Sequence, residues 1–234
     1  MYIPLFCKSN YSFLEGASHP GELVDQCVDY GIEAIALCDR DGMYGVVEAH
    51  TEAAECQVDL IVGSQVTVEG GSTIVLLART RRGYANLCRL ITTGRCRCEK
   101  GTSEVRWEEI AERAEGVLAL WGGRESLLAD PEADQQAVDR VAGLLAEAFG
   151  DRLYALITRH RRPEEADREV LLRRRARRWE LPLVAGHEVL YHEPSRRPLQ
   201  DLLTCIDHGV TIHEAGARTE PNAEHALKSP EAFA

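Results

Sequence analysis

The chain has 234 residues, of which 44% are hydrophobic and 28% are charged, and its formal net charge is −11. This length and composition are typical of one α/β domain with a sizeable core, and they exclude a disordered chain. The negative charge argues against a protein that coats nucleic acid by bulk charge, although basic side chains can still gather locally. No apolar run reaches membrane-spanning length and no signal segment opens the chain, so we expect a cytoplasmic protein without a membrane partner.

The first half of the chain predicts strands and helices that alternate. We expect strands at 2–7, 34–38, 60–63 and 73–78, and helices at about 19–30, 42–57 and 83–91. Residues 34–38 form the continuous apolar run of a parallel strand that is buried on both faces. Pro20 suits the first turn of a helix, and Gly31 suits its end.

The second half continues the same alternation. We expect strands at 117–121, 153–157 and 181–185, and helices at about 135–149, 164–179 and 195–206. The polar stretch 93–106 contains glycines and predicts a surface loop. The whole pattern predicts a barrel-like α/β domain with mainly parallel strands. In such a barrel, the chemistry belongs at the C-terminal ends of the strands.

The eight cysteines are expected to be free thiols. Most of them stand singly in apolar stretches, where a free cysteine behaves as a small hydrophobic residue, and a disulfide framework is the less favoured interpretation. Cys96 and Cys98 form a Cys-x-Cys without a second pair at a zinc-site spacing. We interpret them as surface thiols rather than as a metal knuckle.

The stretch HEVLYH at residues 187–192 is similar to the His-Glu-x-x-His pattern of zinc proteases. The two histidines are one residue too far apart to share a helical face, and the stretch follows a predicted strand instead of lying on a helix. We therefore interpret them as loop histidines. His187 and His192 could still join His160 near the barrel mouth.

Several arginine runs stand out on this acidic chain. The run at 173–178 cannot lie on one helical face, and Glu165 and Glu169 are nearby ion-pair partners, so a solvated helix face is the favoured interpretation. Five other arginines are candidates for sequence-independent contacts with a DNA backbone. They are Arg79, Arg81, Arg82, Arg161 and Arg162.

Three segments carry a resemblance to a known family. They read SNYSFLEGA at 9–17, IALCDRDGMYGVV at 35–47 and LLARTRRGYANLCRL at 76–90. The chain resembles the PHP (polymerase and histidinol phosphatase) domain of bacterial C-family DNA polymerase III alpha subunits, and is most similar to their error-prone branch. The resemblance implies a distorted (β/α)7 barrel, similar to a TIM barrel, at 1–210. Residues 211–234 then resemble the start of a linker to a polymerase core.

The resemblance also implies where a metal site would lie. Active members of the family hold a metal cluster with histidines and carboxylates and hydrolyse phosphoesters. Three of their ligand positions fall on residues that can still bind a metal, which are Glu15, His160 and Glu188. The other positions compared fall on poor ligands or non-ligands, which are Phe6, Lys8, Arg40, Gln65, Thr73 and Leu190.

Two of the replaced positions carry a positive charge. A cation at Lys8 or at Arg40 opposes the entry of a metal ion, and we expect ion pairs with Glu15 or Asp39 inside the former pocket. The resemblance therefore implies a degenerate metal site with no cofactor and no catalytic residue. The chain alone is not expected to be an active enzyme.

The implied function is a structural or interaction scaffold in DNA replication and translesion repair. Its partner would be a polymerase core, on the same or a separate chain, with DNA reached through that polymerase. The chain has no segment with paired catalytic aspartates for polymerisation. Two alternatives stay open, namely a residual or rewired phosphoesterase that uses zinc or manganese, and a DNA-binding accessory module.

Overall fold

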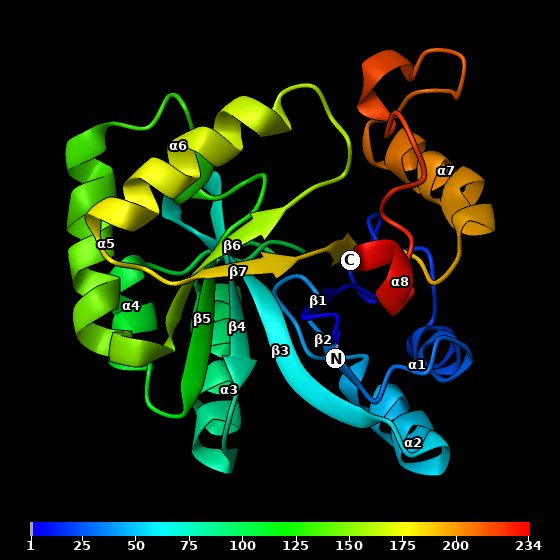
Figure 1. The fold of residues 1–234 in the computed structure, drawn as a ribbon, viewed down its shortest axis with the longest axis horizontal. Helices are drawn as coiled ribbons and strands as arrows, with labels where there is room; N and C mark the ends of the chain where they lie inside the picture. The colour runs from blue at the N-terminus through cyan, green and yellow to red at the C-terminus, as the bar shows by residue number, and fades with distance from the viewer. Residues whose placement is uncertain (1) are drawn as a thin grey trace.

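The computed structural model describes residues 2–234, and over that range eight strands form one sheet. The strands are β1 Phe6–Cys7, β2 Ala34–Leu37, β3 Asp59–Val68, β4 Ser72–Ala78, β5 Val117–Gly122, β6 Leu153–Thr158, β7 Leu183–Gly186 and β8 Glu188–Val189. Their order in the sheet is β7-β6-β5-β4-β3-β2-β1-β8. The sheet curls into a nearly closed barrel with its helices outside (Figure 1).

The helices cover the outer surface of the barrel. They are α1 Pro20–Asp29, α2 Val46–Cys56, α3 Arg81–Arg97, α4 Trp107–Glu112, α5 Gln135–Phe149, α6 Glu165–Arg178, α7 Arg197–Asp207 and α8 Pro230–Phe233. In Figure 1, α1 and α2 lie on one side of the strands, α3 to α6 lie on the other, and α7 lies above α8 and α1. Between residues 2 and 234, no helix combines the length and apolar character that a bilayer crossing requires.

The expected α/β barrel with mainly parallel strands is confirmed. Five strand pairs are parallel, and β4 alone among the described strands runs antiparallel, to both β3 and β5. Only His187 separates β7 from β8, yet β7 pairs with β6 whereas β8 pairs with β1. The chain thus passes from one edge of the sheet to the other within a few residues, and this passage nearly closes the barrel.

The predicted loop at 93–106 is wrong in its first part, because α3 continues to Arg97. Leu90, Ile91 and Gly94 extend the buried face of the helix past the point where the sequence turns polar. The hydroxyls of Thr92 and Thr93 donate to carbonyl oxygens of the preceding turn, so these residues fit the exposed face. The later part, from residue 98 to residue 106, contains no helix, and the unpredicted helix α4 begins directly after it at Trp107.

Other predicted bounds also need correction. The first strand is limited to β1 Phe6–Cys7 instead of 2–7, and α2 begins at Val46 instead of residue 42. The strand expected at 60–63 is much longer, because β3 pairs with β4 through an extended antiparallel register from residue 63 to residue 68. By contrast, α5 has the bounds that its apolar pattern predicts.

The core has three main parts. One lies between the sheet and α3 to α6, and a second lies between β1, β2 and the pair α1 and α2. The third fills the barrel with side chains from several strands, including Phe6, Val75, Leu120 and Leu156. The interior of the barrel is therefore filled with apolar side chains, and the polar side chains that follow the parallel strands lie above this core.

The C-terminal segment lies against the barrel. Ala226 pairs with Tyr191 in a bridge, and Leu227 is buried in the core part beside α1 and α2. Phe233 of α8 stacks on Tyr2, with 4.1 Å between the ring centroids. The division of the chain at residue 210 stays a prediction.

Candidate functional site

The C-terminal ends of the parallel strands surround an open pocket of ≈ 310 Å³, which we call the mouth. Lys8 and Glu15 follow β1, Arg40 follows β2, and Glu188 begins β8. The structure thus brings together most of the residues that the sequence analysis singled out. Gln65 of β3 and the ring of Phe6 also line the mouth.

Lys8 is buried at the centre of the mouth and makes two ion pairs. Its Nζ lies 2.6 Å from Glu15 Oε2 and 2.7 Å from Glu188 Oε1. Burial by itself would raise the pKa of each carboxyl, but the ammonium of Lys8 holds the pKa of Glu15 and of Glu188 below the usual range. Both candidate ligands are therefore ionised, and both are already bound to a cation.

Arg40 adds a second cation to the same cluster. Its Nε donates to Glu15, and its Nη2 donates to Glu125 Oε2 at 2.8 Å. Burial opposes the charge of Arg40, but Glu15 and Glu125 raise the pKa of its guanidinium above the ordinary value. The two cations and three carboxylates form one network, in which Glu15 is shared between Lys8 and Arg40.

Asp39, which was expected as an alternative ion-pair partner of Lys8 or Arg40, binds serines instead. Its carboxylate accepts from the Ser9 backbone N–H at 2.7 Å and from the Ser9 and Ser12 hydroxyls at 2.8 and 2.7 Å. These bonds hold the turn after β1 against the end of β2. Lys8 and Arg40 both pair with Glu15, as expected, whereas the described hydrogen bonds of the Asp39 carboxylate are with serines.

The remaining family positions hold neutral side chains. Gln65 Nε2 donates to Thr73 Oγ1 at 3.1 Å across the antiparallel β3–β4 pair. Phe6 and Leu190 are buried among apolar neighbours. Phe and Leu have no lone pair to offer a metal, and Gln65 and Thr73 are weak ligands that bind each other.

A group of three histidines lies beside the charged network. His160 follows β6, His187 lies between β7 and β8, and His225 comes from the C-terminal segment. His160 and His225 stack with 3.9 Å between ring centroids and an interplanar angle of 11°, and His187 lies 4.7 Å from His160. Burial lowers the pKa of His187 and of His225 to about 3, so both imidazoles are neutral near pH 7.

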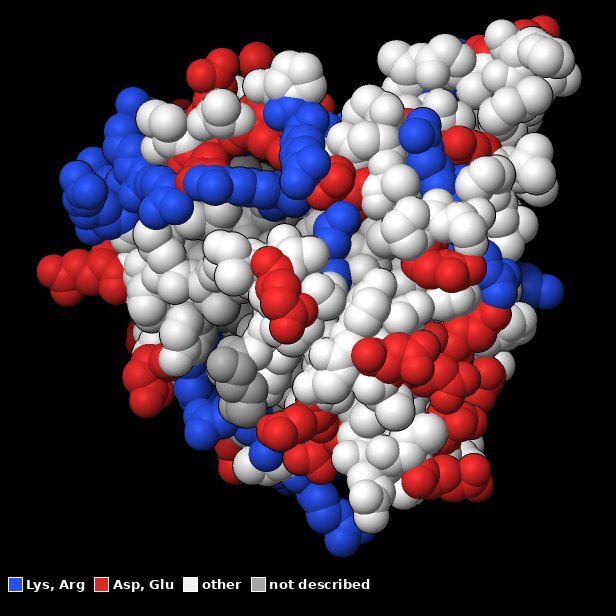
Figure 2. Space-filling model, turned by 45° about the vertical axis from the view of Figure 1, so that its right-hand side comes forward, with Lys and Arg blue, Asp and Glu red and all other residues white. Residues whose placement is uncertain are grey.

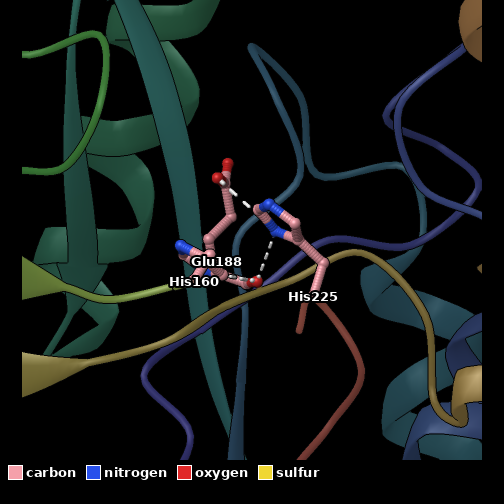
Figure 3. A group of neighbouring side chains, drawn as sticks. All are labelled: His160, Glu188 and His225. Carbon is pink, nitrogen blue, oxygen red and sulfur yellow. Dashed lines mark hydrogen bonds and ion pairs between the residues drawn. The ribbon is translucent and has the colours of Figure 1, made fainter. Parts of the chain in front are cut away.

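His160, Glu188 and His225 are placed so that they could hold a metal ion, since one ligand atom from each lies within 4.8 Å of the others (Figure 3). An imidazole binds a metal along a lone pair in the plane of its ring, at about 2.0–2.1 Å for zinc. Two stacked rings that are nearly parallel cannot both direct a lone pair at one ion. As the side chains lie, the two imidazoles cannot bind one ion together, so a metal held by all three residues would require at least one ring to turn.

The hydrogen bonds of the two stacked rings support this geometry. His160 Nε2 and His225 Nδ1 lie 3.1 and 3.0 Å from the same carbonyl oxygen, that of Glu188. A carbonyl oxygen only accepts, so each of these ring nitrogens carries the proton and donates. His187 Nε2 donates likewise to the carbonyl of Ala226 at 3.1 Å. The imidazoles therefore connect β8 with the C-terminal segment.

Sequence reasoning missed three residues of this site, which are Glu125, Glu220 and His225. Glu125 follows the C-terminal end of β5, a position where a barrel places functional side chains, so that signal was available. Glu220 forms an ion pair with Arg162, and His225 stacks in the mouth, but both come from a segment without strand or helix signals. His192, expected as a further neighbour of His160, instead lies 2.7 Å from the Ser18 hydroxyl.

The five candidate DNA contacts lie at two ends of the barrel. Arg161 and Arg162 follow β6 at the mouth, where they pair with Glu224 at 3.5 Å and with Glu220. Arg79, Arg81 and Arg82 follow β4, whose antiparallel direction puts them beside the first residues of β5 at the opposite end. One DNA path across the mouth therefore cannot reach all five, and these contacts stay a prediction.

The longer arginine run on α6 forms a basic surface with partial pairing. Figure 2 shows basic side chains over the region of α6, and acidic side chains over α1 and α2. Glu169 binds both Arg159 and Arg173, with 2.7 Å between nitrogen and oxygen in each case, and Arg178 pairs with Asp139 at 2.9 Å. Glu169 is thus an ion-pair partner of the run, as expected.

The eight cysteines are all free thiols in the described part of the chain, as expected. Cys96 and Cys98 lie at the end of α3, outside the groups of candidate metal ligands found between residues 2 and 234. The stretch 187–192 does not form a helix, which agrees with its rejection as a zinc-protease pattern.

The chain is a nearly closed α/β barrel with charged side chains at the C-terminal ends of its strands. The fold is similar to that of a crystal structure from Bifidobacterium adolescentis, described as a metal-dependent phosphoesterase, with a TM-score of 0.57 and 15% identity over 80% of this chain and 86% of that chain. The model of the PHP domain family matches residues 5–160, and the chain belongs to this family.

Curated relatives give a more specific likeness. The chain is 42% identical over 247 residues to an error-prone DNA polymerase of Anaeromyxobacter dehalogenans, covering 100% of this chain and 20% of that protein. It is 36% identical over 236 residues to one of Rhodopirellula baltica, covering 100% of this chain and 21% of that protein. The chain is therefore homologous to the PHP domain of these polymerases and spans about a fifth of their length.

Proposed function

We propose that this chain is a catalytically silent PHP domain that serves as a scaffold for a polymerase core in cytoplasmic DNA replication and repair. The observation that carries the proposal is the ammonium of Lys8, which lies between Glu15 and Glu188 in the position of a bound cation. Two-metal hydrolysis of a phosphoester needs several ligands that converge on each ion. Here the carboxylates converge on Lys8 and Arg40 instead.

The charge balance supports the same proposal. A metal ion that enters the mouth must displace Lys8 from two buried contacts, and the displaced ammonium would stay nearby and repel the ion. Arg40 would repel it as well, since its guanidinium keeps its charge at any ordinary pH. The network therefore stabilises the mouth without a metal and leaves no ionised ligand free for one among the family positions described.

Metal content and hydrolysis test this proposal. Purified protein is incubated with zinc or manganese, dialysed, and measured by mass spectrometry for bound metal and with bis(p-nitrophenyl) phosphate for hydrolysis. We expect less than one tightly bound ion per chain and no turnover above buffer. Stoichiometric metal together with hydrolysis that Glu15→Ala abolishes and the surface variant Glu231→Ala leaves intact would overturn the proposal.

A second candidate function is a rewired phosphoesterase that uses zinc or manganese. It is favoured by one observation, the proximity of His160, Glu188 and His225. In that case one of the stacked imidazoles turns when metal is present. Loss of metal binding in His225→Ala but not in the surface variant His50→Ala, measured in the same metal assay, would support this candidate against the silent scaffold.

A further inference from the structure

Helix α7 is amphipathic, but its apolar side faces solvent. Leu199, Leu202 and Ile206 follow the spacing of one helical face. Their side chains are 41%, 50% and 65% exposed. A surface helix of a soluble domain normally turns its apolar face to the core, so α7 has the reverse orientation.

The side of α7 that faces the barrel is largely polar. Gln200 is buried, and together with Thr204 it lines the mouth. Gln200 Nε2 donates to Thr204 Oγ1 at 3.0 Å, so the two polar side chains bind each other on this side of the helix. Cys205 is the other buried residue of the helix. The contacts of α7 with the barrel thus fix its orientation and leave Leu199, Leu202 and Ile206 exposed.

Neighbouring residues extend this apolar surface. Phe13 in the turn after β1 is 78% exposed, and Phe13, Leu199 and Leu203 line a shallow groove of ≈ 220 Å³. We call the exposed set Phe13, Leu199, Leu202 and Ile206 the α7 face. The lobe that carries α7, at the upper right of Figure 2, shows few charged side chains. Contiguous exposed apolar surface of this kind marks a site of protein contact.

We propose that the α7 face is the docking surface for the polymerase module that forms the rest of the homologous chains. This proposal rests on the scaffold function above. The chain covers 20% of the first relative, so about four fifths of that polymerase lies outside the matched region and is available to cover this surface. The segment that leads to the C-terminus passes beside α7, because Leu203 packs in the same cluster as Ala226.

A chimera tests this surface without requiring any polymerase fragment to fold alone. This chain replaces the matching segment of the Anaeromyxobacter dehalogenans polymerase, and hydrogen exchange is compared between the chimera and the isolated chain. We expect amides of α7 and of the turn around Phe13 to exchange at least tenfold more slowly in the chimera. The exposed outer face of α6 around Val170 is the internal reference and should keep its rate.

Substitutions then test the side chains themselves. In the chimera, Leu202→Asp with Ile206→Asp should restore the fast exchange of α7 and make the domain at least tenfold easier to release with protease. The matched control, Val170→Asp, also places a carboxylate at an exposed apolar position, on α6, and should change neither readout. Circular dichroism and unfolding of the isolated double variant check that the barrel itself is intact.

The outcomes separate this proposal from the scaffold function. Protection of another face, with α7 unchanged, overturns the α7 face while the scaffold function stands. Absence of protection anywhere in the chimera overturns both. If α7 is protected in the isolated chain in proportion to its concentration, a second copy covers the face and the proposed partner is wrong.

Discussion

Lys8 is an unusual residue for the interior of a protein, because a fully buried lysine is stable only when it is paired. Burial alone would lower its pKa, but Glu188 and Glu15 raise the pKa above the ordinary value. The turn after β1 is held in turn by the three serine bonds to Asp39, so Glu15 is presented to Lys8 by a fixed loop. We therefore expect the ion pairs of Lys8 with Glu15 and Glu188 to stabilise the folded barrel.

Replacing Lys8 by methionine tests this contribution. Lys8→Met keeps most of the side-chain volume but leaves Glu15 and Glu188 close together without their shared ammonium, so we expect the free energy of unfolding in urea to fall by about 3 kcal/mol at pH 7. Arg82→Met is the control, because Arg82 pairs with Glu115 in solvent at 3.4 Å, and such pairs contribute about 0–1 kcal/mol. Equal effects of the two variants would contradict the prediction.

The buried histidines predict a loss of stability in mild acid. Burial lowers the pKa of His187 to about 3, whereas an unfolded histidine has a pKa of about 6.5. Below about pH 6.5 the unfolded chain therefore binds more protons, and the free energy of unfolding falls with decreasing pH by up to about 1.4 kcal/mol per unit for this residue. His187→Gln should flatten the decline between pH 7 and pH 5.

Between pH 5 and pH 7, the pH dependence of stability reports on the histidines and not on the carboxylates. The lowered pKa values of Glu15 and Glu188 give stability that is present above about pH 4.3 and is lost only at lower pH. His208→Gln, at the exposed end of α7, is the control and should keep the slope of the native protein. An unchanged slope in His187→Gln would show that this imidazole is not held neutral by its surroundings.

At the scale of elements, two glycines on helices give opposite predictions for the same substitution. A Cβ on Gly83, in the first turn of α3, would overlap the carbonyl oxygen of Gly116, which is backbone and cannot move aside. A Cβ on Gly21, in the first turn of α1, would meet only a side-chain atom of Glu52 at 3.7 Å. The first position needs glycine for close packing, whereas the second does not.

We therefore expect Gly83→Ala to lower the free energy of unfolding by at least about 2 kcal/mol, because the helix must move away from the barrel. Gly21→Ala should raise it by up to about 1 kcal/mol, because alanine loses less backbone freedom in a helix. Urea unfolding of both variants measures the two effects. A stabilising Gly83→Ala would show that α3 does not approach Gly116 this closely.

The same elements show what the sequence could and could not predict. The apolar period of α5 marks both of its ends, and the buried run at Ala34–Leu37 marks β2. The direction of β4 could not be read, since an apolar strand has the same pattern in either direction, and this direction decides which end of the barrel Arg79 occupies. The loop predicted at 93–106 was wrong only in its first part, because tertiary burial of Gly94 sustains α3 through polar residues as far as Arg97.

At the scale of the whole molecule, the candidate residues that the sequence places at strand ends lie together at the mouth. Lys8, Arg40 and Glu188 follow or begin strands of one barrel, so their meeting at the mouth follows from the topology. His225 could not be placed in this way, because it comes from a segment with no periodic pattern. Only the fold shows that this segment returns to the mouth and stacks on His160.

Because the C-terminal segment returns to the mouth, cutting the chain at the predicted boundary at residue 210 should affect the stability of the barrel. A chain ending at residue 210 loses the ring of His225 from the mouth, the Glu220 partner of Arg162, and the buried Leu227. We expect its free energy of unfolding in urea to be lower than that of the full chain by several kcal/mol, because each loss exposes or unpairs a buried group.

A chain ending at Lys228 separates the two parts of the segment. It keeps residues 211–228 over the mouth and removes only α8, with the stacking of Phe233 on Tyr2. We therefore expect its free energy of unfolding to fall by only about 1 kcal/mol. If the chain ending at residue 210 is as stable as the full chain, the segment is an independent extension, as the boundary predicts. If it is much less stable, residues 211–228 complete the barrel as part of one folded unit.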